Sequence, residues 1–387
     1  MKILFAVHTY YPEHNGVQFV TQYIAEGLAV DNQVSVITGV SKDTSTTEYL
    51  NTEEINGVLI QRIYVQLGKG HVFSGDKKKY LQIIEKYRPD VFICVCTQSW
   101  TFDWIINYLD EIKCKKVLYT HGFSAYMGHY PFLRDVIGAH IFALYNHMYW
   151  NWYYKRCWKY LKKFDLVTYL SKSSSSYSYS IKYNLVNSLI LGNAVDDRMF
   201  EQCSLNNRKK SQEIGFIYVA NYDENKNQQM ALEAFYKAIT GDATLTLIGT
   251  KRNKYYQNLL GINCNLAKKY GNKGVSILVG ISRDEIMCIE ANSDVFICSS
   301  KHEEFPIMLC EAAAKGLAII STNVGNVSSF PDVDIVNDIN EMANCITIYS
   351  NNRNKRVEAG ESLRNYAQMH FREYDKINQF EKALYKL

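Results

Sequence analysis

Short, uninterrupted apolar runs alternate with helical patterns along most of the chain. A first series consists of Ile3–Val7, Val34–Ile37, Val58–Val65, Val91–Cys96, Val117–Tyr119 and Leu166–Leu170, and a second of Ile214–Val219, Ala243–Ile248, Val275–Val279, Val295–Cys298 and Ala318–Ser321. Strands that are buried on both faces of a parallel sheet have this pattern. The chain is therefore predicted to be an α/β protein with two parallel sheets.

A polar stretch separates the two series. Residues 171–187 are rich in Ser, Tyr and Asn, and residues 196–211 are polar and partly charged. We predict a first domain over residues 1–187 and a second over residues 188–367. The last stretch, from about residue 368 to 387, is predicted to be a helix that packs back on the first domain, because apolar residues recur at helical spacing there. These residues are Phe371, Tyr374, Ile377, Phe380 and Leu384.

The charge pattern excludes several classes of protein. The chain carries 43 Lys and Arg against 39 Asp and Glu, mixed along the sequence, without the basic stripe of a nucleic-acid-binding protein. No apolar run approaches the roughly 18–20 residues of a membrane span. We therefore expect neither a nucleic-acid partner nor a transmembrane segment.

The cysteines and the first residues indicate a cytoplasmic protein. Most cysteines, such as Cys94, Cys288, Cys298 and Cys310, lie in apolar segments, which is typical of buried, reduced thiols. There is no C-x-x-C pair and no histidine at ligand spacing, so no metal site is predicted. The N-terminus runs directly from apolar residues into His8 without a cleavage site, which favours a first strand over a signal peptide.

The most informative segment is residues 299–316, which follows a predicted strand. Pro306 is suited to the first turn of a helix, where its missing N–H is unpaired anyway, and Gly316 is suited to the end of that helix. The N–H groups of Ile307 and Met308 would point out of the helix start, where the macrodipole attracts anions. We predict that this helix start holds a diphosphate.

Two glutamates belong to the same segment. Glu303 precedes the predicted helix, and Glu311 lies within it, eight positions later. Eight helical positions at 100° each leave the two side chains roughly 80° apart, so they do not converge like the two carboxylates of a glycosidase. Separate roles are predicted: one carboxylate accepts hydrogen bonds from sugar hydroxyls and the other from ribose hydroxyls.

The whole segment has the pattern Ser-x-x-x-Glu-x-Phe-Pro-x-x-x-x-Glu-Ala-x-Ala-x-Gly, with Phe305 before the proline. This pattern resembles the donor signature of retaining glycosyltransferase family 4, the glycosyl transferases group 1. The resemblance implies the GT-B fold, in which two Rossmann-like domains face each other across a cleft. It also implies sugar transfer from a nucleotide diphosphate sugar without a bound metal or other cofactor.

Further landmarks follow in the order of that family. Residues 11–17 resemble its Gly-Gly loop, with Asn15 in place of the first glycine. Gly16 remains, and a glycine lets the backbone approach the phosphates of a ligand. Thr120-His121-Gly122 resembles its histidine-glycine loop on the acceptor side, and residues 193–196 resemble the Asn-Gly-Val-Asp sequence that opens the second domain. In residues 219–227, Lys226 matches the diphosphate lysine, whereas Asn221 stands where the family usually has arginine.

The resemblance also implies roles for these residues. Glu303 would orient the donor sugar, Glu311 the ribose, and His121 the 6-position of the sugar or the reacting region. Lys226 and the helix start at Ile307–Met308 would stabilise the charge that builds on the departing diphosphate. That phosphate would take the proton of the acceptor on the same face of the sugar, which gives retention. Glu304 departs from the family pattern, since a glycine is usual there.

The predicted acceptor is a hydroxyl of a glycan or a lipid-linked glycan, as in surface polysaccharide biosynthesis. Tyr145–Lys163 places aromatic residues on one helical face and lysines on the other, with Trp152 as an exception. This pattern predicts either peripheral contact with an anionic membrane at its inner face or a helix whose aromatic face completes the first core.

Three other functions share parts of this pattern. A dinucleotide-dependent oxidoreductase is excluded because no G-x-G-x-x-G follows a strand. A non-catalytic module that binds a nucleotide sugar or a partner is favoured by Asn15, Asn221 and Glu304. A nucleotide-sugar epimerase would share the two-domain architecture. The last two alternatives remain open at the level of the sequence.

Overall fold

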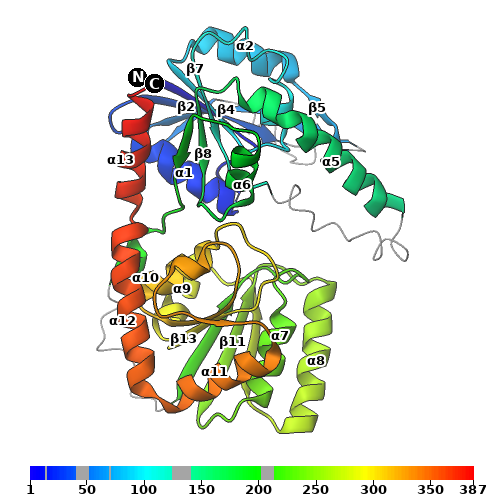
Figure 1. The fold of residues 1–387 in the computed structure, drawn as a ribbon, viewed down its shortest axis with the longest axis vertical. Helices are drawn as coiled ribbons and strands as arrows, with labels where there is room; N and C mark the ends of the chain where they lie inside the picture. The colour runs from blue at the N-terminus through cyan, green and yellow to red at the C-terminus, as the bar shows by residue number, and fades with distance from the viewer. Residues whose placement is uncertain (14, 41–51, 69–70, 124–140, 202–212) are drawn as a thin grey trace. The chain divides into compact units, whose positions relative to one another are not determined.

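The chain divides into two compact units in the computed structural model, which describes residues 1–13, 15–40, 52–68, 71–123, 141–201 and 213–387. The first unit is Met1–Asn193 together with Glu373–Leu387, and the second is Ala194–Arg372. Each unit contains its own sheet (Figure 1). The prediction of an α/β chain with two sheets is confirmed.

In the first unit, the described residues form a nine-stranded sheet in the order β3-β4-β2-β1-β6-β7-β8-β9, with β5 also paired to β4. All pairs are parallel except those of β3 and β5 with β4. The strands are β1 (Lys2–Val7), β2 (Gln33–Val40), β3 (Glu53–Ile55), β4 (Val58–Leu67), β5 (Phe73–Gly75), β6 (Val91–Val95), β7 (Lys115–Tyr119), β8 (Leu166–Tyr169) and β9 (Ser188–Ile190). The helices are α1 (Gly16–Leu28), α2 (Lys77–Tyr87), α3 (Trp100–Asp103), α5 (Ile141–Leu161), α6 (Ser175–Lys182) and α13 (Glu373–Leu384).

The second unit has six strands among the described residues, all parallel, in the order β12-β11-β10-β13-β14-β15. They are β10 (Ile214–Val219), β11 (Ala243–Gly249), β12 (Gly274–Val279), β13 (Val295–Cys298), β14 (Ala318–Thr322) and β15 (Asp334–Val336). The helices are α7 (Gln228–Lys237), α8 (Lys254–Tyr270), α9 (Arg283–Ala291), α10 (Ile307–Lys315), α11 (Ile339–Asn351) and α12 (Arg353–His370). The strand order reverses between β10 and β13, and ligands of open α/β sheets bind at such a point, beyond the carboxyl ends of the strands.

The units divide at Asn193 and Ala194, six residues after the predicted boundary between residues 187 and 188. The reason is β9, which pairs in parallel with β8 and so extends the first sheet. This strand is only three residues long, with one exposed and two half-buried side chains, so its sequence carries no continuous apolar signal.

The end of the chain is two helices rather than one from about residue 368. Helix α12 ends at His370, and α13 begins at Glu373. Phe371, between them, packs in the core of the second unit, and its carbonyl accepts a hydrogen bond from Val195 N–H (3.0 Å). Tyr374 is 69% exposed and so does not belong to the packed face. A Cβ at Gly27 of α1 would clash with the Ile377 side chain, which shows how closely α13 packs on α1.

Helix α5 completes the core of the first unit, as one of the two interpretations of its sequence predicts. Tyr154, Cys157 and Leu161 are buried in that core, and Trp150 and Trp158 pack against it. Trp152 is 51% exposed. No helix of the described residues is both long and apolar enough to cross a bilayer. Of the cysteines expected to be buried, Cys94, Cys298 and Cys310 are, whereas Cys288 is exposed.

Candidate functional site

The loops that follow β10 and β13 are held together at the point where the strand order of the second unit reverses. Lys301 N–H donates to the Asn225 carbonyl (2.7 Å), and Asn225 Nδ2 donates to the His302 carbonyl (2.9 Å). The buried Tyr218 hydroxyl donates to the Lys226 carbonyl (2.7 Å). These bonds bring together two segments that lie 77 positions apart in the sequence.

Lys226 and Glu303 form an ion pair across these two loops. Lys226 Nζ lies 2.5 Å from Glu303 Oε1, and their side chains are 20% and 12% exposed. An ammonium group has three donors, so Lys226 can bond an anion in addition to, or in place of, this carboxylate. The structure therefore places a half-buried cation next to the segment that leads into α10.

Helix α10 begins at Ile307, with Pro306 as its N-cap residue and no side-chain cap. The first amides of a helix have no acceptor within it, and here these are the amides of Ile307 and Met308. Leu309 N–H, the next along the chain, donates to the Pro306 carbonyl (3.1 Å). Gly316, in the left-handed region at φ 74°, ends the helix as predicted. Phe305 contacts Phe371 edge-on, with ring centroids 6.2 Å apart. The arrangement offers two outward amides at the positive end of a helix, four and five positions after Glu303, the partner of Lys226.

The Glu311 carboxylate is paired with a cation in the structure. It forms a two-pronged pair with the Arg283 guanidinium, of which one contact is 3.2 Å. Arg283 is the first residue of α9, and no local signal in the sequence indicates this partner, 28 positions away. An ionised carboxylate has about four acceptor positions, so two remain for hydroxyl donors.

Glu290 is a further acidic residue of this cluster that sequence reasoning missed. It is 0% exposed, and neither carboxyl oxygen has a hydrogen-bond partner among the described residues. Burial and the nearby Glu311 carboxylate raise the pKa of Glu290 to about 8, while Arg283 and Lys315 act in the opposite direction. Glu290 is therefore protonated at neutral pH.

Two of the departures from the family pattern, Asn221 and Glu304, each have a local partner. Asn221 Oδ1 accepts a hydrogen bond from the Thr250 hydroxyl (2.7 Å), in the loop after β11. The Asn221 side chain thus joins two loops at the carboxyl ends of the strands of the second sheet, but it supplies no positive charge. Glu304 lies 3.6 Å from the His302 imidazole.

In the first unit, His121 follows β7 at its carboxyl end. Burial lowers the pKa of His121 to about 4, so the ring is neutral at physiological pH. Its Nε2 is buried and has no partner among the described residues. Gly122 has φ 97°, which turns the chain directly after the histidine. A neutral imidazole here can exchange a hydrogen bond with a ligand but contributes no charge.

Two more polar residues lie where the strand order of the first sheet reverses, between β1 and β6. His8 Nδ1 and the Ser99 hydroxyl are 3.4 Å apart, and burial lowers the pKa of His8. The sequence could have indicated His8 as a candidate site residue, because His8 follows a buried strand, as His121 does.

The predicted phosphate loop is a helix start in the structure. Asn15 caps α1 by accepting a hydrogen bond from Gln18 N–H (2.9 Å), and Gly16 is the first residue of the helix. The asparagine in place of the family glycine thus has a local structural reason. His14, in the same motif, lies outside the described residues.

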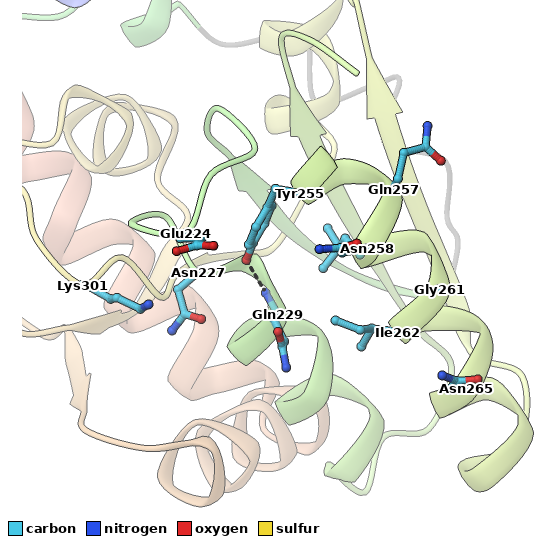
Figure 2. A pocket seen from close by; sticks show the side chains of 11 residues that line it. Glu224, Asn227, Gln229, Tyr255, Gln257, Asn258, Gly261, Ile262, Asn265 and Lys301 are labelled. Atoms are coloured by element: carbon cyan, nitrogen blue, oxygen red, sulfur yellow. Dashed lines mark hydrogen bonds between the residues drawn. The ribbon is translucent and has the colours of Figure 1, made fainter. Parts of the chain in front are cut away.

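A polar pocket of about 600 Å³ lies beside this site, between the start of α7 and α8 (Figure 2). Glu224, Asn227 and Lys301 line one side, and Tyr255 and Asn258 line the side formed by α8. None of the predicted site residues lines it, although Asn227 and Lys301 are close in sequence to the Lys226–Glu303 pair.

Part of the chain matches a family of known proteins. Residues 201–361 match the family described as Glycosyl transferases group 1. Over 173 residues the chain is 25% identical to N-acetyl-alpha-D-glucosaminyl L-malate synthase of Bacillus anthracis, and this match covers 43% of the chain and 44% of that protein. The chain thus matches less than half the length of this relative.

Solved structures with the same fold match the whole chain. HepE of Anabaena, crystallised with UDP and glucose, has a TM-score of 0.74 at 14% identity, with 100% of both chains covered. Sucrose-phosphate synthase from Thermosynechococcus elongatus has a TM-score of 0.76 at 15% identity, over 100% of this chain and 98% of that one. With these matches the resemblance is confirmed: the chain has the GT-B fold, and its residues 201–361 match the glycosyl transferases group 1.

Proposed function

We propose that the protein transfers a sugar, with retention and without a bound metal, from a nucleotide diphosphate sugar to a hydroxyl of a glycan or lipid-linked glycan. The observation that carries the proposal is the Lys226–Glu303 pair beside the uncapped start of α10, at the reversal of strand order. A cation and outward amides at this point suit a diphosphate. HepE, a structural neighbour, was crystallised with UDP and glucose, which favours a uridine nucleotide as the first donor to test.

In the proposed reaction, negative charge builds on the departing diphosphate. Lys226 and the amides of Ile307 and Met308 would stabilise this charge more strongly than that of the bound donor, which is the condition for faster transfer. When the donor binds, its diphosphate replaces Glu303 as the partner of the Lys226 ammonium group. The Glu303 carboxylate can then accept hydrogen bonds from the hydroxyls of the sugar. The departing phosphate then takes the proton of the acceptor hydroxyl.

Other residues would position the two substrates. Arg283 fixes the orientation of Glu311, whose two remaining acceptor positions would bond the ribose hydroxyls. His121, neutral at physiological pH, would hold a sugar hydroxyl through Nε2. Because Asn221 supplies no charge, the exposed Lys251 and Arg252, which directly follow its partner Thr250, are the candidates to replace the missing arginine.

Thermal-shift screening of nucleotide sugars tests the proposal, followed by turnover with a glycolipid extract as acceptor. A ligand at 100 times its Kd is expected to add about 2.7 kcal/mol to the free energy of unfolding. Nucleotide diphosphate should then be released only when acceptor is present. Binding without turnover would favour a non-catalytic module, and a changed sugar nucleotide without acceptor would favour an epimerase.

Peripheral contact with an anionic membrane is part of the proposal for a lipid-linked acceptor. Its support is the exposed lysines Lys155 and Lys159 on α5 and Lys162 directly after it, near the half-exposed Trp152. Reversal of these three charges is expected to abolish sedimentation with liposomes that contain anionic lipid. Unchanged sedimentation would remove the membrane from the proposal, and neutral liposomes serve as the control.

A further inference from the structure

The first unit contains a second pocket, of about 320 Å³, between β5, α3 and α5. Its walls are mostly aromatic and include Phe73, Trp104, Tyr149 and Trp152. The pocket is fixed to the carboxyl end of β6, because Gln98 N–H, in the loop after that strand, donates to the Tyr153 hydroxyl (3.1 Å). Pockets with apolar walls and few polar groups are typical of small-molecule sites.

One carboxylate, that of Asp103, lies in this aromatic wall. Asp103 Oδ1 accepts a hydrogen bond from the Tyr153 hydroxyl (2.9 Å). Burial raises the pKa of Asp103 to about 6, so the group is ionised at pH 7.5. No cation among the described residues forms an ion pair with it. A half-buried carboxylate with a single neutral donor is an unfavourable arrangement unless a positive partner completes it.

A positive group already lies against one wall of the pocket. The Arg156 guanidinium stacks over the Trp152 ring, 4.4 Å from its centroid, instead of pairing with Asp103. Aromatic faces attract cations through the ring quadrupole, and aromatic cages of this kind bind organic ammonium groups. The aromatic wall and the carboxylate therefore favour the same class of ligand, a cation with an apolar body.

We infer that this pocket binds an organic ammonium ion, with Asp103 as its counter-charge and the aromatic side chains around its apolar groups. The inference does not depend on the proposed transfer reaction. An ammonium group could belong to an amino sugar or to a choline-type headgroup, and both bring one positive charge on an organic body to this site. If the transfer reaction also holds, the pocket would select acceptors that carry an amine.

Quenching of tryptophan fluorescence by choline tests the inference on the full-length protein, since Trp104 and Trp152 line the pocket. Choline is expected to quench saturably at pH 7.5, and its neutral isostere 3,3-dimethylbutanol is expected to bind at least about tenfold more weakly, as the loss of an attraction of about 1.4 kcal/mol predicts. Glucosamine is compared with glucose in a second arm. Whichever ammonium compound binds more tightly identifies the source.

Three variants test the charge that the pocket recognises. Asp103→Asn, which can still accept from Tyr153, should weaken choline binding by about tenfold. Arg156→Gln should strengthen it severalfold, because a repelling charge is removed. Glu111→Gln, an exposed carboxylate close in sequence, should change nothing. If Arg156→Gln instead weakens binding, the ligand is an anion or a neutral sugar, and the inference is wrong.

The pH dependence gives an independent check. Choline keeps its charge at every pH, so its affinity should fall from pH 7.5 to pH 5 as Asp103 takes up a proton. His71, Tyr149, Tyr153, Cys157 and Arg156 also line the pocket. To isolate Asp103, the comparison is made in a His71→Gln background, in which the fall in affinity should disappear on Asp103→Asn. A pH dependence that persists in this variant, or equal binding of choline and 3,3-dimethylbutanol, would overturn the inference.

Discussion

Lys226→Ala is expected to lower the rate of sugar transfer by about 10²–10³-fold, as the loss of one charge-stabilising group in a transition state does. The ammonium group is paired at 2.5 Å with Glu303, which lies in the segment that leads into α10. The rate is measured as release of nucleotide diphosphate from the donor that the thermal-shift screen identifies. Lys226→Arg, which keeps the charge, should retain more activity than Lys226→Ala.

Controls are needed because removal of Lys226 leaves the largely buried Glu303 carboxylate without its partner. Lys268→Ala removes an exposed lysine from the end of α8 and should leave both rate and stability unchanged. Lys226→Ala with Glu303→Gln removes the uncompensated charge, so restored stability in this double variant would show that the unpaired carboxylate causes any instability of Lys226→Ala. Full transferase activity in Lys226→Ala would contradict the proposed role.

Glu290→Gln is expected to stabilise the protein, by an amount that grows with pH between about 5 and 8. The pKa of Glu290 is about 8 in the folded protein, against an ordinary value of 4.5. Between these values the folded state holds a proton that the unfolded chain has released, so the free energy of unfolding falls as pH rises. One proton contributes at most about 1.4 kcal/mol per pH unit. Glutamine removes this contribution.

Urea denaturation at pH 5.5, 7, 8 and 9 measures the effect. The difference in unfolding free energy between Glu290→Gln and the unaltered protein should increase at each step and level off above pH 8. The groups that face Glu290 are Arg283 on α9 and Glu311 and Lys315 on α10. Glu358→Gln, an exposed glutamate on α12, is the matched control and should give curves parallel to the unaltered protein. Parallel curves for Glu290→Gln would refute the raised pKa.

Local sequence was sufficient for the parts of the site that lie on one element. Pro306 and Gly316 mark the two ends of α10, and the helix observed is Ile307–Lys315. The reason is that a proline without an N–H and a glycine at positive φ each suit one position at a helix end. The same local logic explains Asn15, whose side chain caps α1.

Residues that act through distant partners were not predictable in this way. Arg283 and Glu290 lie on α9, and nothing in their immediate sequence indicates that they contact Glu311 on α10. The carboxylate of Asp103 likewise acquires its aromatic surroundings only when α3, β5 and α5 come together. Burial and charge at such positions depend on how elements pack, which periodicity does not specify.

The sequence by itself determined the architecture, because buried parallel strands must be apolar on both faces and so appear as continuous runs. The resemblance of its motifs to the glycosyl transferases group 1 also pointed to Lys226, Glu303 and the start of α10 as candidate site residues. Only the tertiary structure decided that Lys226 pairs with Glu303, that Glu311 is held by Arg283, and that the short strand β9 belongs to the first sheet. These facts depend on contacts between segments far apart in the chain, and hydrogen bonds and ion pairs of that kind form only once folding has placed their partners.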